Sequence, residues 1–189
     1  MKKKYKLTTN TKIVFGKKLF QIKALVSFGN VAAGDLGGYI EKEENLSHDG
    51  NAWVYGDAWV YGDARVSGDA RVFGDAQVFG DARVFGDAQV FGDAQVSGDA
   101  WVYGDAQVSG DAWVYGDADY ICFKGFGSKS RNTTMFRTKN GDVCVSCGCF
   151  TGSLKEFSEK VKETHGSSKY AKEYLACVEA VKIHFEIDD

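Results

Sequence analysis

A six-residue repeat fills the middle of this chain and constrains its fold more than any other feature. From Asn51 to Ala118 the sequence repeats Gly-Asp-Ala-x-Val-z, where x is Trp, Arg or Gln and z is Tyr, Phe or Ser. A period of six excludes an α-helix, whose period is 3.6, and favours stacked short strands. The alanine and the valine lie two residues apart and therefore share one face of a strand. Because x is mostly polar, the Ala–Val face must be the buried one.

Glycine and aspartate are then expected at the corners between strands. Glycine tolerates the unusual backbone angles of a corner, and an aspartate carboxylate can accept hydrogen bonds from nearby backbone amides. The repeat carries an excess of acidic residues, which also suggests a mimic of nucleic acid or a calcium site. We favour corner aspartates, because the calcium-binding β-roll has a nine-residue repeat with more glycines.

Three hexads predict one coil of a parallel β-helix, with successive coils about 4.8 Å apart. Residues 18 positions apart then lie in columns, and the z positions form columns of aromatic rings. Two interpretations remain open, since the rings either lie flat and shield the corners or form a contact face. On the second interpretation the protein is a homo-oligomer, a dimer or trimer, because large exposed apolar patches usually mark interaction surfaces. The interface would then contain Phe73, Phe79, Phe85 and Phe91.

The sequences before and after the repeat predict two further units. Residues 1–30 predict a β-rich N-terminal cap, and residues 31–119 predict the β-helix, which begins with an irregular coil and is mostly strand. Residues 120–189 predict a small α+β domain with a hairpin turn at residues 139–142. Its first helix begins at the capping box from Ser153 to Glu156. Its second helix, at about residues 168–184, is expected to bury Tyr170, Tyr174, Cys177, Val178 and Val181.

Charge and composition exclude several classes of protein. With 23 basic and 26 acidic residues the net charge is −3, so direct nucleic-acid binding is not expected. No apolar run approaches the roughly 18 residues of a membrane helix, and the basic N-terminus lacks the apolar region of a signal peptide. Five cysteines are an odd number, which fits a reducing compartment better than a disulfide framework. We therefore expect a cytoplasmic protein without a membrane partner.

The cysteines raise the question of a metal site. Cys144-Val145-Ser146-Cys147-Gly148-Cys149 has a spacing that suits zinc, but on a strand Cys144 faces away from Cys147 and Cys149. We expect reduced thiols buried in a β core, and neither a metal nor another cofactor. A zinc site and a reactive thiol remain the alternatives.

A second candidate site is the polar segment from Gly125 to Thr134. It is dense in amide, hydroxyl and cationic donors, which suit an anion, a nucleotide or a partner protein. We expect Arg131 and Arg137 to converge on one anion or on an acidic partner surface, and their joint replacement by alanine to leave folding intact. The alternative is an ordinary polar loop. The candidate ligand- or partner-binding residues are Lys129, Ser130, Arg131, Thr133 and Arg137.

The whole chain resembles the hexapeptide-repeat proteins of phages and prophages. The resemblance is carried by the array and by four segments outside it, Tyr5-Lys6-Leu7-Thr8, Gly34-Asp35-Leu36-Gly37-Gly38-Tyr39-Ile40, Asn45-Leu46-Ser47 and Cys147-Gly148-Cys149-Phe150-Thr151-Gly152. It implies a left-handed β-helix, a phage or mobile-element origin and a host cytoplasm. The expected fold is therefore mainly β, a left-handed parallel β-helix with a β-rich N-terminal cap and a small C-terminal α+β domain.

A β-helix of hexads also suggests an acyltransferase, which would need a histidine base on or beside the β-helix. The three histidines, His48, His165 and His184, all lie outside the array, and we predict no catalytic residue. Our leading hypothesis is a non-enzymatic interaction protein, an oligomeric scaffold that presents its C-terminal domain to a host protein, such as a defence component, or to a small nucleotide. The alternative is a hexapeptide-type acyltransferase or another enzyme with its site in the C-terminal domain.

Overall fold

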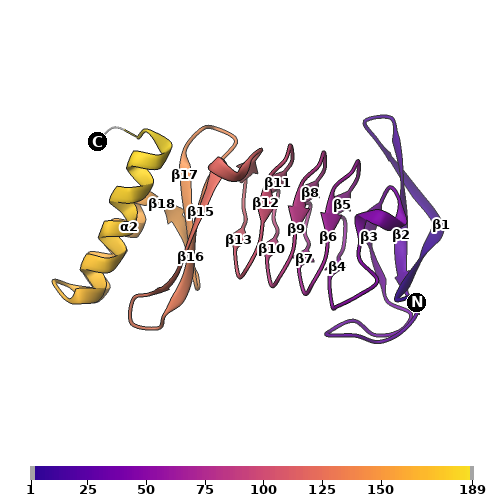
Figure 1. The fold of residues 1–189 in the computed structure, drawn as a ribbon, viewed down its shortest axis with the longest axis horizontal. Helices are drawn as coiled ribbons and strands as arrows, with labels where there is room; N and C mark the ends of the chain where they lie inside the picture. The colour runs from indigo at the N-terminus through magenta and orange to yellow at the C-terminus, as the bar shows by residue number, and fades with distance from the viewer. Residues whose placement is uncertain (1–2, 188–189) are drawn as a thin grey trace.

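The computed structural model describes residues 3–187 and shows three parts in a row along one axis (Figure 1). A β-hairpin at the N-terminal end is followed by a β-solenoid of about four turns and then by a β-sheet covered by two helices. The predicted fold class, a mainly β solenoid with a small C-terminal α+β domain, is confirmed. The left-handed coil remains an expectation from the resemblance. In residues 3–187, neither helix has the length and the hydropathy that a membrane crossing requires.

Each hexad contributes a strand of only two residues, the x residue and the valine. The expectation that residues 31–119 are mostly strand is therefore wrong, because the other four residues of each hexad form the corner. The strands are β4 (Trp53–Val54), β5 (Trp59–Val60), β6 (Arg65–Val66), β7 (Arg71–Val72), β8 (Gln77–Val78), β9 (Arg83–Val84), β10 (Gln89–Val90), β11 (Gln95–Val96), β12 (Trp101–Val102), β13 (Gln107–Val108) and β14 (Trp113–Val114).

The strands stack with a register of 18 residues, as the repeat predicts. Val90 pairs in parallel with Val72 on one side and with Val108 on the other. The orders β5-β8-β11-β14, β13-β10-β7-β4 and β12-β9-β6 form the three sides of the solenoid. The alanines from Ala52 to Ala112 and the valines from Val54 to Val114 form the core, and none of them is more than 1% exposed. Ala118, the last alanine of the repeat, was also expected to point inward but is exposed, because the chain leaves the solenoid there in a 3-10 turn. The x-position arginines point outward as predicted, whereas Trp53, also an x residue, is 1% exposed and packs edge-on against Tyr5 and Phe28 of the N-terminal region.

The corners are held mainly by the backbone. The N–H of Asp63 donates to the carbonyl of Gly80 at 2.8 Å, and the same bond joins Asp81 to Gly98. Of the repeat aspartates within residues 3–187, only Asp69 and Asp117 accept a backbone N–H through the side chain. The prediction that the aspartate carboxylates accept backbone N–H groups is therefore wrong for most corners. At those corners the carboxylate faces solvent or pairs with a lysine.

The z-position rings form the predicted columns and stack within one chain. Phe73 stacks on Phe91 with ring centroids 4.9 Å apart, Tyr61 on Phe79 at 5.0 Å, and Phe85 on Tyr103 at 5.4 Å. The four phenylalanines Phe73, Phe79, Phe85 and Phe91 are half-buried, because each ring covers a face of its neighbour.

The N-terminal region closes the first end of the solenoid. Strands β1 (Tyr5–Val14) and β2 (Lys17–Ala24) form an antiparallel hairpin, and β3 (Leu36–Ile40) joins it to β5. Lys4 Nζ donates to the carbonyls of Gly50 (3.3 Å) and Ala52 (2.9 Å), which no preceding coil can pair. Burial lowers the pKa of Lys4 to about 8. Asn45, at the end of a 3-10 turn (Glu43–Asn45), donates in the same way to the carbonyls of Gly62 and Ala64.

The C-terminal sheet closes the other end. It contains β15 (Tyr120–Phe126), β16 (Arg131–Arg137), β17 (Val143–Cys147) and β18 (Phe150–Ser153), and it follows a 3-10 turn (Asp117–Asp119). Phe136 and Tyr120 join the core of the solenoid, whereas Met135 and Val145 join the core beneath the helices. The hydroxyl of Thr134 accepts the N–H of Gln107 at 3.0 Å. The sheet is thus buried on both faces.

Two helices cover the outer face of this sheet, α1 (Leu154–His165) and α2 (Lys169–Phe185). The predicted capping box is confirmed, since Ser153 Oγ accepts the N–H of Glu156 while a Glu156 oxygen accepts the N–H of Ser153. Four of the five residues predicted to be buried on the second helix are buried. The exception is Tyr170, which is half-buried and packs against His165.

Replacing Val84 by aspartate should unfold the array, because Val84 is 0% exposed in a middle coil and an unpaired buried charge costs about 3–5 kcal/mol. We expect loss of the cooperative transition in thermal circular dichroism. The matched control, Arg83→Gln at the exposed neighbour, places a residue that other hexads carry at this position and should change stability by about 0.5 kcal/mol or less. A Val84→Asp protein as stable as this control would contradict the described core.

Candidate functional site

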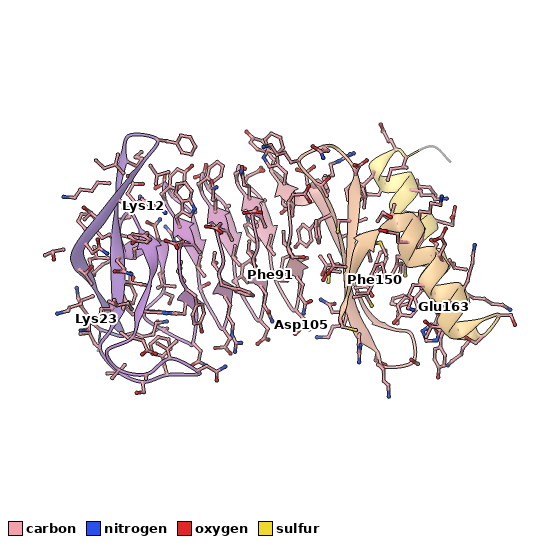
Figure 2. All side chains as sticks on the ribbon, turned by 180° about the vertical axis from the view of Figure 1, so that it is seen from behind. Lys12, Lys23, Phe91, Asp105, Phe150 and Glu163 are labelled. Atoms are coloured by element: carbon pink, nitrogen blue, oxygen red, sulfur yellow. The ribbon has the colours of Figure 1, made fainter. Side chains whose placement is uncertain are left out.

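The main candidate site is a cavity of about 380 Å³ between two hairpin turns and the inner face of α1, which we call the module cavity. The turn between β15 and β16 and the turn between β17 and β18 form one side, and α1 with one residue of α2 forms the other. Figure 2 shows Phe150, one of the lining residues, on the helix side of the C-terminal sheet. The lining residues are Ser128, Lys129, Arg131, Cys147, Cys149, Phe150, Phe157, Lys160, Val161, Thr164, His165 and Tyr174.

Two glycines allow the hairpin turns to approach this cavity closely. Gly127 has a φ of +72°, and a Cβ at this position would lie 2.0 Å from the hydroxyl of Tyr174. Its N–H donates to Glu173 at 2.9 Å, which ties the first turn to α2. At Gly148 (φ +63°) a Cβ would lie 2.4 Å from a guanidinium nitrogen of Arg131. A side chain at either position would therefore displace a residue of the cavity wall.

An arc of four rings lines the wall formed by β18 and the helices. Phe150 lies 5.3 Å from Phe157, Phe157 lies 5.6 Å from Tyr174, and Tyr174 lies 5.8 Å from His165, measured between ring centroids. We call these four residues the aromatic arc. Phe157 and Tyr174 are buried, whereas Phe150 and His165 are half-buried. Burial raises the pKa of Tyr174 to about 12, and the neighbouring Cys147 thiol is the second cause of this shift. The phenol therefore stays protonated at neutral pH and can donate a hydrogen bond.

The cavity is lined by cations without carboxylates. Lys129, Arg131 and Lys160 contribute positive charge, and no Asp or Glu is among the described residues that line it. Lys160 pairs with Glu163 at 2.8 Å outside the cavity. Within residues 3–187, the side chains of Lys129 and Arg131 have neither an ion-pair nor a hydrogen-bond partner. Such a mouth can attract and hold an anion.

The structure brings together only part of the predicted site. Lys129 and Arg131 line the cavity, while Ser130 has a left-handed φ of 48° in the turn and Ser128 takes its place in the wall. Thr133 is buried behind the cavity and donates its hydroxyl hydrogen to Cys147 Sγ at 3.1 Å. Thr133 therefore supports the wall and is not available to a ligand.

Arg137 does not converge with Arg131, because the two residues occupy opposite ends of β16. Its guanidinium lies 5.0 Å from the ring centroid of Phe185, and Nη2 donates to the Phe185 carbonyl at 3.0 Å. A second nitrogen, Nε, lies 3.7 Å from Asp119. The expectation that the two arginines converge, on one anion or on one acidic partner surface, is wrong, and Arg137 instead joins the sheet to the end of α2.

Sequence reasoning missed the helical half of the cavity. Phe157, Lys160 and His165 were not predicted as site residues. Thr164, which follows Lys160 by four positions, lies on the same face of the helix. That spacing was visible in the sequence, but nothing in it indicates that this end of α1 lies opposite the turn at residues 127–130.

The prediction for the cysteines is confirmed for the side of the sheet on which they lie and is wrong for their burial. Cys144 packs toward the solenoid core and Cys147 toward the helix core, as strand alternation predicts. All five thiols are free, but Cys122 and Cys149 are exposed and only Cys177 is buried, so most are not the buried core thiols that were expected. Burial raises the pKa of Cys177 to about 11. In the part of the chain that the structure describes, no three His, Cys, Asp or Glu side chains are grouped closely enough to hold a metal ion.

A second cavity, of about 570 Å³, lies at the seam between the last coil and the C-terminal sheet. Its polar side chains are engaged in joining the two parts. Lys124 pairs with Asp105, Asn132 donates to the Asp105 carbonyl at 2.6 Å, and His184 Nε2 lies 2.9 Å from the Ala118 carbonyl. This cavity therefore offers fewer free groups to a ligand than the module cavity does.

Comparison with known proteins supports the solenoid and adds no activity. The family model described as the YdcK beta solenoid repeat matches residues 64–78, 76–92, 88–104 and 94–110, which all lie within the array. No curated protein matches the chain.

Replacing Arg137 by alanine should destabilise the protein by about 1–3 kcal/mol, because it removes the charge-assisted hydrogen bond from β16 to the Phe185 carbonyl of α2 and the ion pair with Asp119. Arg131→Ala, at the exposed end of the same strand, should change stability by about 0.5 kcal/mol or less. Urea denaturation followed by circular dichroism measures both. Equal stability of the two variants would contradict the structural role of Arg137.

Proposed function

We propose that this protein is a non-enzymatic binding protein in which a rigid β-solenoid carries a C-terminal domain that holds a small anionic ligand in the module cavity. The observation that carries the proposal is the cationic lining, in which Lys129 and Arg131 have no partner among the described residues. The guanidinium of Arg131 offers paired donors that match two oxygens of a phosphate or a carboxylate. It therefore binds such an anion in a more defined orientation than the point charge of an ammonium group does.

Neutral donors complete the set of groups that an anion would need. Ser128 and Thr164 bring hydroxyls to the wall, and Tyr174 brings a phenol that stays protonated. Of the two cysteines that line the cavity, Cys147 accepts a hydrogen bond from Thr133 and lies 4.0 Å from the Tyr174 hydroxyl, and within residues 3–187 neither is hydrogen-bonded to a histidine. The residues described thus pair no thiol with a histidine base, which favours binding over nucleophilic catalysis.

The resemblance to phage hexapeptide-repeat proteins supports a host cytoplasm as the place where the protein binds its anion. In a host cytoplasm, a protein that holds a small anion removes it from solution or senses it. The proposal therefore gives the C-terminal domain the binding role and gives the solenoid a purely mechanical one.

Titration calorimetry with inorganic pyrophosphate tests this function. We expect saturable binding by the wild-type protein and about tenfold or greater weakening in Arg131→Ala, since hydrogen bonds to charged groups contribute about 1.5–3 kcal/mol. Arg65→Ala removes an exposed arginine from the solenoid and should bind as the wild type does. No binding at millimolar concentration, or equal weakening by both variants, would refute the proposal.

We further propose that the solenoid self-associates through its aromatic columns, with Phe73, Phe79, Phe85 and Phe91 at or near the contact. The half-buried rings stack in pairs and form short apolar stripes, and exposed Tyr103 and Tyr115 lie at z positions of the last coil. Light scattering at micromolar concentration should give the mass of a dimer or trimer, and the joint replacement Phe73→Gln with Phe91→Gln should shift it toward the monomer. A monomeric mass for the wild type would reject self-association and would leave the ligand proposal intact.

A further inference from the structure

We infer that the ligand of the module cavity is a mononucleotide with more than one phosphate, a nucleoside diphosphate being the best fit. The inference rests on the proposed function and adds the chemical class of the ligand. It is drawn from the presence of two chemically different surfaces in one cavity, the unpaired cations and the aromatic arc.

The aromatic arc provides a surface for a planar ring. Phe150 and His165 are half-buried, so each keeps part of its ring uncovered, and both line the cavity. Behind them the buried rings of Phe157 and Tyr174 are in contact with each other and fix their positions. A nucleobase stacks on such rings without needing a particular hydrogen-bond pattern. An inorganic anion would leave this half of the cavity unused.

The cations provide for more than one phosphate. Lys129 and Arg131 come from one hairpin, and Lys160 comes from the facing helix. Lys160 already pairs with Glu163 outside the cavity, so Lys129 and Arg131 are the two lining cations that no carboxylate among the described residues offsets. A diphosphate has a phosphoryl group for each of these two cations, whereas a monophosphate has only one to share between them. The exposed position of Lys129 and Arg131 places the phosphates at the mouth and leaves the interior to the base.

The size of the cavity limits the ligand to a single nucleotide. Its volume of about 380 Å³ lies at the lower end of the range of about 300–1,000 Å³ that is usual for small-molecule sites. An oligonucleotide or a folded partner domain would not enter such a space. A phosphorylated peptide could place its phosphate on Arg131, but it need not carry a planar ring that stacks on the aromatic arc. The test below therefore includes a phosphoserine peptide.

The experiment compares ADP, pyrophosphate and a short phosphoserine peptide by titration calorimetry on the full chain. The wild type should bind ADP about 5- to 100-fold more tightly than pyrophosphate, which is the range that base stacking on an aromatic side chain provides. Phe150→Leu should lose most of this advantage and keep the affinity for pyrophosphate. The matched control, Phe123→Leu, changes a half-buried phenylalanine of the same sheet that lies outside the cavity and should retain the advantage. Thermal melting of both variants establishes that they are folded.

The outcomes separate this inference from the proposed function. If pyrophosphate binds through Arg131 and ADP binds no more tightly, the anion site stands and the nucleotide inference is wrong. The inference is also wrong if Phe150→Leu keeps the full advantage of ADP, or if the phosphoserine peptide binds more tightly than ADP. If neither ADP nor pyrophosphate binds, both the inference and the proposed function fall.

Discussion

Main-chain hydrogen bonds between successive coils are the interaction on which the rest of this structure depends. The regular ones run from an N–H to a carbonyl 17 positions further along the chain, as from the N–H of Arg71 to the carbonyl of Ala88 at 2.9 Å. Their regular spacing requires that every coil have the same length, and the small Ala–Val core allows the coils to stack without adjustment. A stack of this kind has two open ends, because the first and last coils have no neighbour on one side.

Both ends are closed by groups that a repeat cannot supply. At the first end Lys4 and Asn45 donate to carbonyls of the initial coil, and at the second the hydroxyl of Thr134 accepts the N–H of Gln107. The C-terminal sheet is therefore part of the solenoid on one face and part of a separate helical core on the other. The module cavity belongs to the second core, so closing the solenoid also fixes the orientation of the cavity.

The repeat made most of the fold predictable, and the site much less so. A strict period determines which residues are inside, and the alanines and valines follow it from Ala52 to Val114. Trp53 is buried, unlike the other x-position residues, because the N-terminal region covers it. Arg137 has a structural contact instead of the predicted binding role, because α2 packs across the sheet and brings the Phe185 carbonyl to its guanidinium. Both contacts join segments that are far apart in the sequence, and the periodicity of a single sequence does not indicate such contacts. The same reason hid Lys160 and His165, whose role depends on where a helix lies relative to a distant hairpin.

Three hexads per coil also set how the length of this protein can change. The N-terminal hairpin continues the side formed by β5, and β16 contacts β13 and β14 at the other end. Adding or deleting three hexads would move the two ends apart or together along the axis and keep their rotational phase. A gain or loss of one hexad would instead turn the C-terminal domain by a third of a revolution relative to the hairpin. Insertions of 18 residues are thus the conservative unit of length variation for this architecture.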